Sequence, residues 1–471
     1  VVNTAGTLNI HQYNTNAAGF TISANIVNNG TGALTVVKSG SGTLVLTGTN
    51  NYSGGLVVNA GEVRLGTAGM GASTNIITLN GGTLKANATV TALSLSQLVG
   101  ATTAGTLSLQ DSAATPAAVT INVGGGSVAN TFLGTVAGKG TLLKSGTAAL
   151  TLSGLVTTAD NPNLTIDNGT IGFQQAGLGN SPYALGAPVL ANFGTGALLL
   201  GNAITSTTAT ALDLTNASAT FGSLKVQNRG ATSGTALVNT VTVGYGRSLT
   251  VTGNTSIGGQ GAATGNWRTD VTFTGGGTLT LGDGNARTIN FGEATTETTS
   301  YATSSVVDMS GLTLVNLNAG PTGAINLALR GNQQAGALTN VILGSVQNVV
   351  TAGTLTVGAG PGGAGNGNTP HSFRLGAGAN LLNIDTINLG TIDRDSGQVI
   401  FNGNTGTVVL RNAAGTGAAN VNVGYTTAGS TTGYDATNTF DVSGHYADLN
   451  IATLALGTTP GRTSNASAAL F

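Results

Sequence analysis

The chain is 471 residues long and only 7% of them are charged, whereas about 25% are charged in ordinary soluble proteins. Fifteen basic and sixteen acidic residues leave a net charge of −1, which excludes the basic stripe that nucleic-acid binding requires. The chain has no cysteine, which excludes disulfides, thiolate nucleophiles and sulfur-ligated zinc. A chain that must stay unfolded in an oxidising compartment before export benefits from lacking cysteine, so this composition is consistent with secretion.

Short strands are the expected elements throughout the chain. The signal is an alternation of apolar and small polar residues over four to six positions, ended by Gly or Asn. The first predicted series lies at residues 43–46, 56–58, 62–65, 76–79 and 83–85. A second series, in which an apolar residue is followed by Gly, lies at residues 278–282, 341–344, 355–358, 387–390, 421–424 and 454–457.

These strands recur at about 14 to 20 residues, or near twice that spacing, which is typical of a β-solenoid. Gly and β-branched residues occur in every window of a dozen positions, so no helical stripe is expected and we predict essentially no α-helix. In a parallel coil, Gly or Asn can occupy left-handed corners, and each inward Leu, Val or Ile stacks on its counterpart one coil away. We therefore predict an all-β rod with roughly 20 residues per coil.

Three Gly-, Pro- and Asn-rich blocks are predicted to be protruding loops, at residues 258–267, 359–370 and 426–435. None is long enough to be a separate domain, and no shift in composition marks a boundary. No apolar run approaches the roughly 20 residues of a membrane helix. We therefore predict a single continuous domain over residues 1–471 with no membrane-spanning segment.

Internal repetition is clearest at residues 38–84. The segment begins with KSGSGTLVLTG (38–48), continues with NNYSG (50–54) and VNAGEV (58–63), and ends with NGGTL (80–84). Residues 144–173 repeat the first element as KSGTAALTLSG and keep a weaker strand pair at 164–173, but lack the Asn-x-Tyr turn. These elements resemble the passenger-associated transport repeat of bacterial autotransporters.

This resemblance implies a right-handed parallel β-helix, secreted to the surface or exterior of a Gram-negative-type bacterium, with the repeat associated with export and folding. The family has no common active site to transfer. The resemblance is close over a tenth to a fifth of the chain, and the remainder matches in style.

Candidate catalytic groups are few. The three histidines are His11, His371 and His445, and none stands at the spacing of a triad or a metal site. His445 follows Asp441 by four residues, a spacing that brings side chains together on a helix and not on a strand. We expect structural or exposed roles for all three.

Acidic residues offer two further candidates. Asp393 and Asp395 flank Arg394, and alternate residues on a strand share one face, so the two carboxylates could bind a cation or act on a glycoside. The favoured interpretation is a charged turn. Residues 282–285 read Gly-Asp-Gly-Asn, which suggests a calcium loop, but the spacing fits a tight turn better.

Lysines and aromatic residues are the groups that could line a polysaccharide-binding cleft. The lysines are at positions 38, 85, 139, 144 and 225, which leaves none for a cluster in the C-terminal half. The aromatic residues that could stack on sugars are Trp267, Tyr245, Tyr425, Tyr434 and Tyr446, and packing or turn roles are favoured for them.

The sequence thus assigns no catalytic, cofactor-binding or metal-ligating residue. The leading hypothesis is a secreted or surface-displayed structural or adhesive protein that self-associates laterally or end to end. The alternatives are a polysaccharide lyase or glycosidase on the same scaffold, and a non-catalytic glycan-binding module. Expected partners are copies or further repeats of the same chain and extracellular glycans, with nucleic acid excluded.

Overall fold

Only strands, turns and irregular segments occur in the described residues of this computed structural model, and none of these residues is helical. The structure describes residues 4–71, 75–124, 126–152, 162–173, 189–201, 209–227, 237–258, 267–292, 303–328, 338–358, 370–390, 396–424, 438–457 and 466–469. The predicted absence of helix holds for these segments. Most of the three predicted loops lies outside them, at residues 259–266, 359–369 and 426–435.

The strands are short in the first half of the chain. They are β1(Gly6–His11), β2(Phe20–Ile22), β3(Leu34–Ser39), β4(Thr43–Leu46), β5(Leu56–Val58), β6(Glu62–Leu65), β7(Ile76–Leu79), β8(Thr83–Ala86), β9(Ala92–Leu95), β10(Gln97–Val99), β11(Thr106–Asp111), β12(Thr120–Val123), β13(Asn130–Phe132), β14(Thr135–Ala137), β15(Thr141–Lys144), β16(Leu150–Leu152), β17(Asn163–Ile166), β18(Gly169–Phe173), β19(Val189–Asn192), β20(Ala197–Leu200), β21(Thr210–Leu214), β22(Ala217–Phe221) and β23(Ser223–Val226).

Longer strands appear in the second half. They are β24(Leu237–Val243), β25(Ser248–Val251), β26(Thr255–Ile257), β27(Trp267–Thr274), β28(Thr278–Leu281), β29(Thr288–Phe291), β30(Thr303–Asp308), β31(Leu314–Leu327), β32(Thr339–Ile342), β33(Gln347–Val357), β34(His371–Leu375), β35(Ala379–Leu389), β36(Gly397–Phe401), β37(Thr407–Arg411), β38(Ala419–Val423), β39(Asn438–Asp441), β40(Tyr446–Leu449), β41(Ile451–Leu456) and β42(Ala466–Ala469). Both predicted series of strands fall on these elements.

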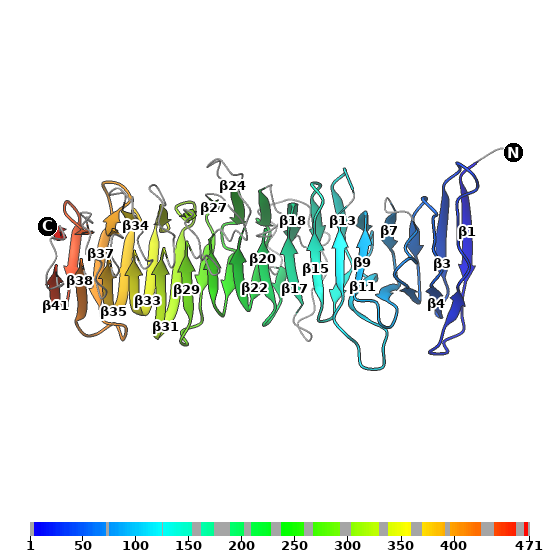
Figure 1. Cartoon of the computed structure of the whole chain (residues 1–471), viewed down its shortest axis with the longest axis horizontal. Helices are drawn as coiled ribbons and strands as arrows, with labels where there is room; N and C mark the ends of the chain where they lie inside the picture. Colours follow the sequence, from blue (N-terminus) through cyan, green and yellow to red (C-terminus); the bar gives the residue numbers. More distant parts are fainter. Residues whose placement is uncertain are drawn as a thin grey trace, which may run out of the picture. The chain divides into compact units, whose positions relative to one another are not determined.

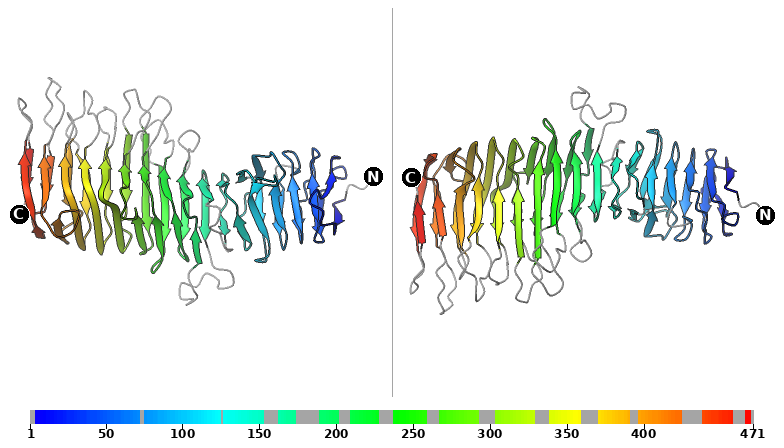
Figure 2. Two further views of the ribbon diagram at one scale, coloured as in Figure 1. Left: turned by 90° about the horizontal axis from the view of Figure 1, so that it is seen from below. Right: turned by 90° about the horizontal axis from the view of Figure 1, so that it is seen from above.

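The chain divides into two compact units, which are described separately. Unit 1 comprises Val1–Leu198 and Ala211–Thr220, and unit 2 comprises Leu199–Thr210 and Phe221–Phe471. Within each unit, neighbouring strands lie side by side and run in the same direction (Figures 1 and 2). Unit 1 contains a five-stranded sheet in the order β1-β3-β5-β7-β10 and a six-stranded sheet in the order β14-β11-β8-β6-β4-β2, both parallel. These parallel ladders confirm the all-β class and the parallel β-helix; the right hand of the coil stays a prediction.

The length of a coil differs between the units. In unit 1, Thr43 pairs with Glu62 and Glu62 with Thr83, a step of about 20 residues that agrees with the sequence-based expectation. In unit 2 the step is longer. The backbone N–H of Thr339 donates to a side chain 32 residues later in sequence, and another inter-coil bond spans 34 residues. The prediction of roughly 20 residues per coil is therefore wrong for unit 2, where strands such as β31, β33 and β35 are also longer than the strands of unit 1.

The core of unit 2 is a set of stacked columns of inward side chains. One column, aligned by strand register, consists of Ile289, Ile325, Leu355, Ile387 and Val421, all fully buried. Parallel pairing sets consecutive members about 4.8 Å apart, which allows each side chain to pack directly on the next. This confirms the predicted stacking of inward apolar residues.

Glycine forms most of the predicted corners in unit 2. Five of the six apolar-Gly pairs have a positive φ angle at the glycine, at Gly282, Gly358, Gly390, Gly424 and Gly457. The sixth, Gly344, is not left-handed, and its carbonyl instead accepts a bond from Nδ2 of the buried Asn348, 2.9 Å away. Left-handed backbone is costly for residues with a Cβ atom, which explains why the corner glycines recur at the ends of strands.

Candidate functional site

The clearest unusual group in unit 1 is a lysine in the core of the repeat. Lys38 lies on β3 in an inward position, between Ile10 of the preceding coil and Val58 of the following coil in the strand register. It is fully buried, whereas its neighbours in the column are apolar. Lysine is rarely buried without partners, so its ammonium group must be compensated within the coil.

The ammonium group of Lys38 is held by backbone carbonyls at a corner. Its Nζ donates to the oxygens of Ser39 at 2.9 Å, Gly40 at 2.7 Å and Ala60 at 3.1 Å. Ser39 and Gly40 belong to the same corner as the lysine, and Ala60 belongs to the corresponding corner of the next coil. The three donors of one ammonium group therefore join two consecutive coils.

Glycine provides the space for this arrangement. Gly61 has a φ of 72°, and a Cβ atom there would lie 2.9 Å from the Nζ of Lys38. Larger residues at this position would displace the ammonium group or strain the backbone. The KSG element of one coil and the NAG element of the next coil thus form two stacked corners that share the ammonium group of Lys38.

The Asn-x-Tyr element forms a second buried polar contact. Asn50 accepts from the backbone N–H of Ile26 at 2.8 Å and donates to the carbonyl of Gly69 at 2.9 Å, so it bridges three segments. Tyr52 is fully buried, and its carbonyl accepts from Nδ2 of Asn75 at 2.8 Å. Burial raises the pKa of the Tyr52 hydroxyl above its usual value.

The second copy of the repeat reproduces the lysine corner. Lys144, at the end of β15, is buried between Val123 and Ile166 in the strand register, and its Nζ donates to the carbonyl of Gly146. The backbone hydrogen bonds of the two copies also correspond. The carbonyl of Lys38 accepts the N–H of Asn59 from the next coil, and the carbonyl of Lys144 accepts the N–H of Asp167 in the same way. Burial lowers the pKa of Lys38 and lowers that of Lys144 to about 8.

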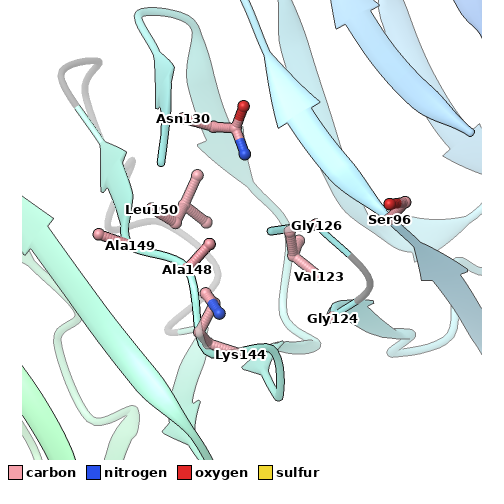
Figure 3. Close-up of a pocket in the computed structure, with 9 residues that line it drawn as sticks. All are labelled: Ser96, Val123, Gly124, Gly126, Asn130, Lys144, Ala148, Ala149 and Leu150. Atoms are coloured by element: carbon pink, nitrogen blue, oxygen red, sulfur yellow. The ribbon is translucent and has the colours of Figure 1, made fainter. Parts of the chain in front are cut away.

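A small cavity adjoins Lys144. Figure 3 shows its lining residues, which are Ser96, Val123, Gly124, Gly126, Asn130, Lys144, Ala148, Ala149 and Leu150. Its volume of about 10 Å³ is sufficient for roughly one water molecule and too small for an organic substrate. The cavity therefore suits solvation of a buried ammonium group and not catalysis on a metabolite.

The histidines lie apart, and two of them, His371 and His445, make local structural contacts. His11 is exposed on β1. His371 is 6% exposed, and its Nδ1 accepts the backbone N–H of Thr339 at 3.0 Å. His445 stacks on the ring of Phe401, with 3.7 Å between centroids, and its Nδ1 lies 2.9 Å from the carbonyl of Ser443.

Of the three acidic candidates, the structure describes Asp283 only. In the Gly-Asp-Gly-Asn turn, both oxygens of Asp283 accept from Arg287, at 2.9 and 2.7 Å, and Asn285 adds further bonds. The hydrogen bond from Arg287 holds the pKa of Asp283 below its usual range. This carboxylate is a turn group, as expected. Asp393 and Asp395 lie outside the described residues, so their role stays a prediction.

The aromatic candidates do not form a common face in the described part of the chain. Tyr245 lies in a turn and is 85% exposed, whereas Tyr446 begins β40 and is 70% exposed. The two residues belong to different coils. Trp267 begins β27, while Tyr425 and Tyr434 lie outside the described residues. Within the described residues, no group of three or more His, Cys, Asp or Glu side chains could hold a metal ion. No helix in the same residues is long and apolar enough to cross a membrane.

Sequence reasoning missed the role of the two buried lysines. It considers the lysines only as possible members of a polysaccharide cleft. The signal that could have found them is the recurrence of Lys-Ser-Gly at residues 38–40 and 144–146, in which each lysine stands at the end of a strand with inward apolar residues.

Replacing the corner lysine should loosen the repeat. We expect Lys38→Met to lower the free energy of unfolding of its coils by about 2 kcal/mol, because three part-buried carbonyls lose their donor while the apolar stem is retained. Hydrogen exchange of the backbone amides in residues 36–65 measures this locally. The matched control is Lys85→Met, which removes a half-buried lysine whose ion pair with Glu62 spans 3.3 Å; such pairs contribute about 0–1 kcal/mol. Equal exchange in the two variants would contradict the role of Lys38.

Stability of unit 1 should rise with pH in the alkaline range. Because the pKa of Lys144 is about 8 in the folded chain and the usual value is 10.5, the unfolded chain binds more protons between these values. The free energy of unfolding should therefore increase from about pH 8 to pH 10, above which ionisation of Tyr52 in the unfolded chain opposes it. Amide exchange in β12, β15 and β17 measures the trend. Lys144→Met should flatten it, the exposed Lys139→Met should not, and a wild-type profile without a slope would refute the explanation.

A comparison with protein-family models finds a match, which lies on the coils that contain the Lys38 corner. The passenger-associated-transport-repeat model matches residues 36–65, which span the Lys38 corner, the Asn-x-Tyr turn and strand β6. No curated protein matches the chain. No solved structure matches it either. The repeat match and the parallel strands around it support a likeness to the β-helical passengers of autotransporters.

Proposed function

We propose that this chain is a structural or adhesive passenger, displayed on or released from the surface of a Gram-negative-type bacterium. The observation that carries the proposal is the passenger-associated transport repeat at residues 36–65. A repeat of this kind implies secretion or surface display. The low charge and the absence of cysteine in the sequence are consistent with that route.

The contacts of the candidate groups favour a structural role. Lys38 and Asp283 are each occupied by hydrogen bonds within the chain, and His371 accepts a backbone N–H. Catalytic acids and bases need access to a substrate, and Lys38 and His371 are buried. Asp283 is exposed, but both of its carboxylate oxygens accept hydrogen bonds from Arg287 and Asn285. The polysaccharide-cleaving alternative depends on Asp393 and Asp395, and alanine at both positions should abolish any lyase or glycosidase activity that a glycan screen detects.

Self-association is the second part of the proposal. Strand β41 pairs with β38, and its Leu454 and Leu456 continue the core columns of Val421 and Val423. They are 38% and 50% exposed. An apolar edge of this kind accepts another parallel strand, from further repeats or from a second copy.

Protease added to intact source cells tests the location. We expect the chain to be degraded or shaved from the cells by proteinase K, while a periplasmic marker protein stays intact. Detection of the chain in the culture medium would equally support export. A chain that resists the protease in intact cells, is absent from the medium and is degraded only after lysis would overturn surface display.

Sedimentation velocity over a range of concentrations tests association. We expect the purified chain to sediment faster as its concentration rises, and Leu456→Glu to suppress this shift because a carboxylate in an apolar contact is costly to desolvate. Thr453→Glu is the matched control, since Thr453 is exposed on the same strand and faces outward. Monomers at every concentration would refute self-association.

A further inference from the structure

A groove lies on the outer face of unit 2, across strands β23, β26 and β29. Its volume is about 270 Å³, near the lower limit of small-molecule pockets. The residues that line it are Ser223, Leu224, Lys225, Asn254, Thr255, Ser256, Thr288 and Asn290. Seven of these eight residues are polar, and none is acidic or aromatic.

Strand register brings the charged group of the groove next to its neutral polar groups. Lys225 pairs with Ser256, which in turn pairs with Asn290, so the three residues occupy one outward column on consecutive coils. Lys225 is exposed, Ser256 is half-buried and Asn290 is buried. Among the described residues, no carboxylate pairs with the Lys225 ammonium group, whereas Arg287 and Arg411 each have an aspartate partner.

Part of the polar lining is fixed by bonds within the protein. Oδ1 of Asn254 accepts the backbone N–H of Thr288 at 3.0 Å, and Oδ1 of Asn290 accepts from Nδ2 of Asn326 at 3.0 Å. Both amide groups are therefore held in a defined orientation. Preorganised donors of this kind bind a ligand with less loss of side-chain freedom.

The polar column continues beyond the groove. After Asn290, the register places Asn326, Thr356, Asn388 and Asn422 in the same column on successive coils; Thr356 is buried and the three asparagines are half-buried. The last pair is also bonded, with Nδ2 of Asn422 donating to Oδ1 of Asn388 at 2.8 Å. Consecutive coils are about 4.8 Å apart, so the half-buried asparagines of the column stand one or two coil spacings from each other, close to the length of one or two sugar rings.

We propose that this groove binds an anionic polysaccharide. In this arrangement the ammonium group of Lys225 pairs with a carboxylate or sulfate of the ligand, and the hydroxyl and amide groups of Ser256, Thr288 and Asn254 bond its ring hydroxyls. The outward column beyond Asn290 extends the track for longer chains. This inference deepens the adhesive part of the proposed function by naming a ligand class, and it rests on that function only for the ligand's place outside the cell.

The lining distinguishes this ligand from its competitors. A neutral glycan is normally held by ring stacking on aromatic side chains, and the groove has none. Nucleic acid needs several cations along its backbone, and the groove has one. A single exposed lysine gives a weak contact at each site, so measurable affinity should depend on chain length and fall with salt.

Binding by the purified full chain tests the proposal, with polygalacturonate, dextran sulfate and neutral dextran as probes at low ionic strength. We expect polygalacturonate, dextran sulfate or both to bind, and the one that binds identifies carboxylate or sulfate as the recognised group. Lys225→Gln should weaken binding about fivefold, as expected for loss of an exposed charge contact. Ser256→Glu should weaken it at least as much, because a carboxylate next to Lys225 neutralises the lysine and repels the ligand.

Controls separate this result from a loss of folding and from the proposed location. Lys139→Gln removes an exposed lysine of unit 1, outside the groove, and should bind as the unmodified chain does. Far-UV circular dichroism should be the same for all variants. Equal binding of neutral dextran, unchanged binding by Lys225→Gln, or no binding of either anionic probe would overturn the proposal. Failure of surface display would appear in the protease experiment and would leave this binding result unaffected.

Discussion

Parallel stacking of the backbone is the constraint on which the rest of the structure depends. Each strand bonds to the strand one coil before and one coil after, so an inward side chain must pack on its counterpart and not on a residue of free choice. The column from Ile289 to Val421 shows the result, with β-branched and Leu side chains superposed on successive coils. Polar side chains are therefore concentrated at corners, at outward positions and at strand ends next to a corner, where Lys38 lies.

Corners carry the unusual chemistry for this reason. At a corner the carbonyl groups leave the ladder and need other donors. Lys38 supplies three N–H groups to such carbonyls. In unit 2, Nδ2 of Asn348 donates to the carbonyl of Gly344, and the two N–H groups on Nδ2 of Asn380 are shared among the carbonyls of Gly376, Gly378 and Thr407. Buried lysine and asparagine are thus alternative solutions to one problem. The lysine carries a desolvation cost, seen as its lowered pKa, which the neutral asparagine avoids.

Much of the fold was predictable because each coil uses the same pattern of inward apolar residues and corner glycines. Alternation of apolar residues located strands such as β4, β6 and β28, and the apolar-Gly pairs located corners such as Gly390 and Gly424. Coil length in unit 2 was not predictable, since turns of different length are compatible with the same stacked columns. The lysine corner was not predicted, because the Lys38 ammonium group binds the backbone carbonyls of Gly40 and Ala60, and no side-chain motif reveals such acceptors. The Lys225 groove escaped because register, and not sequence proximity, joins Lys225 to Ser256 and Asn290.

The bond from Lys38 to Ala60 also has a consequence for the order of assembly. The other two acceptors, Ser39 and Gly40, adjoin the lysine in sequence, whereas Ala60 arrives 22 residues later. The ammonium group can therefore remain partly hydrated until the next coil closes over it. Completion of one coil then strengthens the attachment of its neighbour, so folding free energy accrues in steps along the chain instead of in one all-or-none transition. A chain that emerges gradually from a pore can fold in that order.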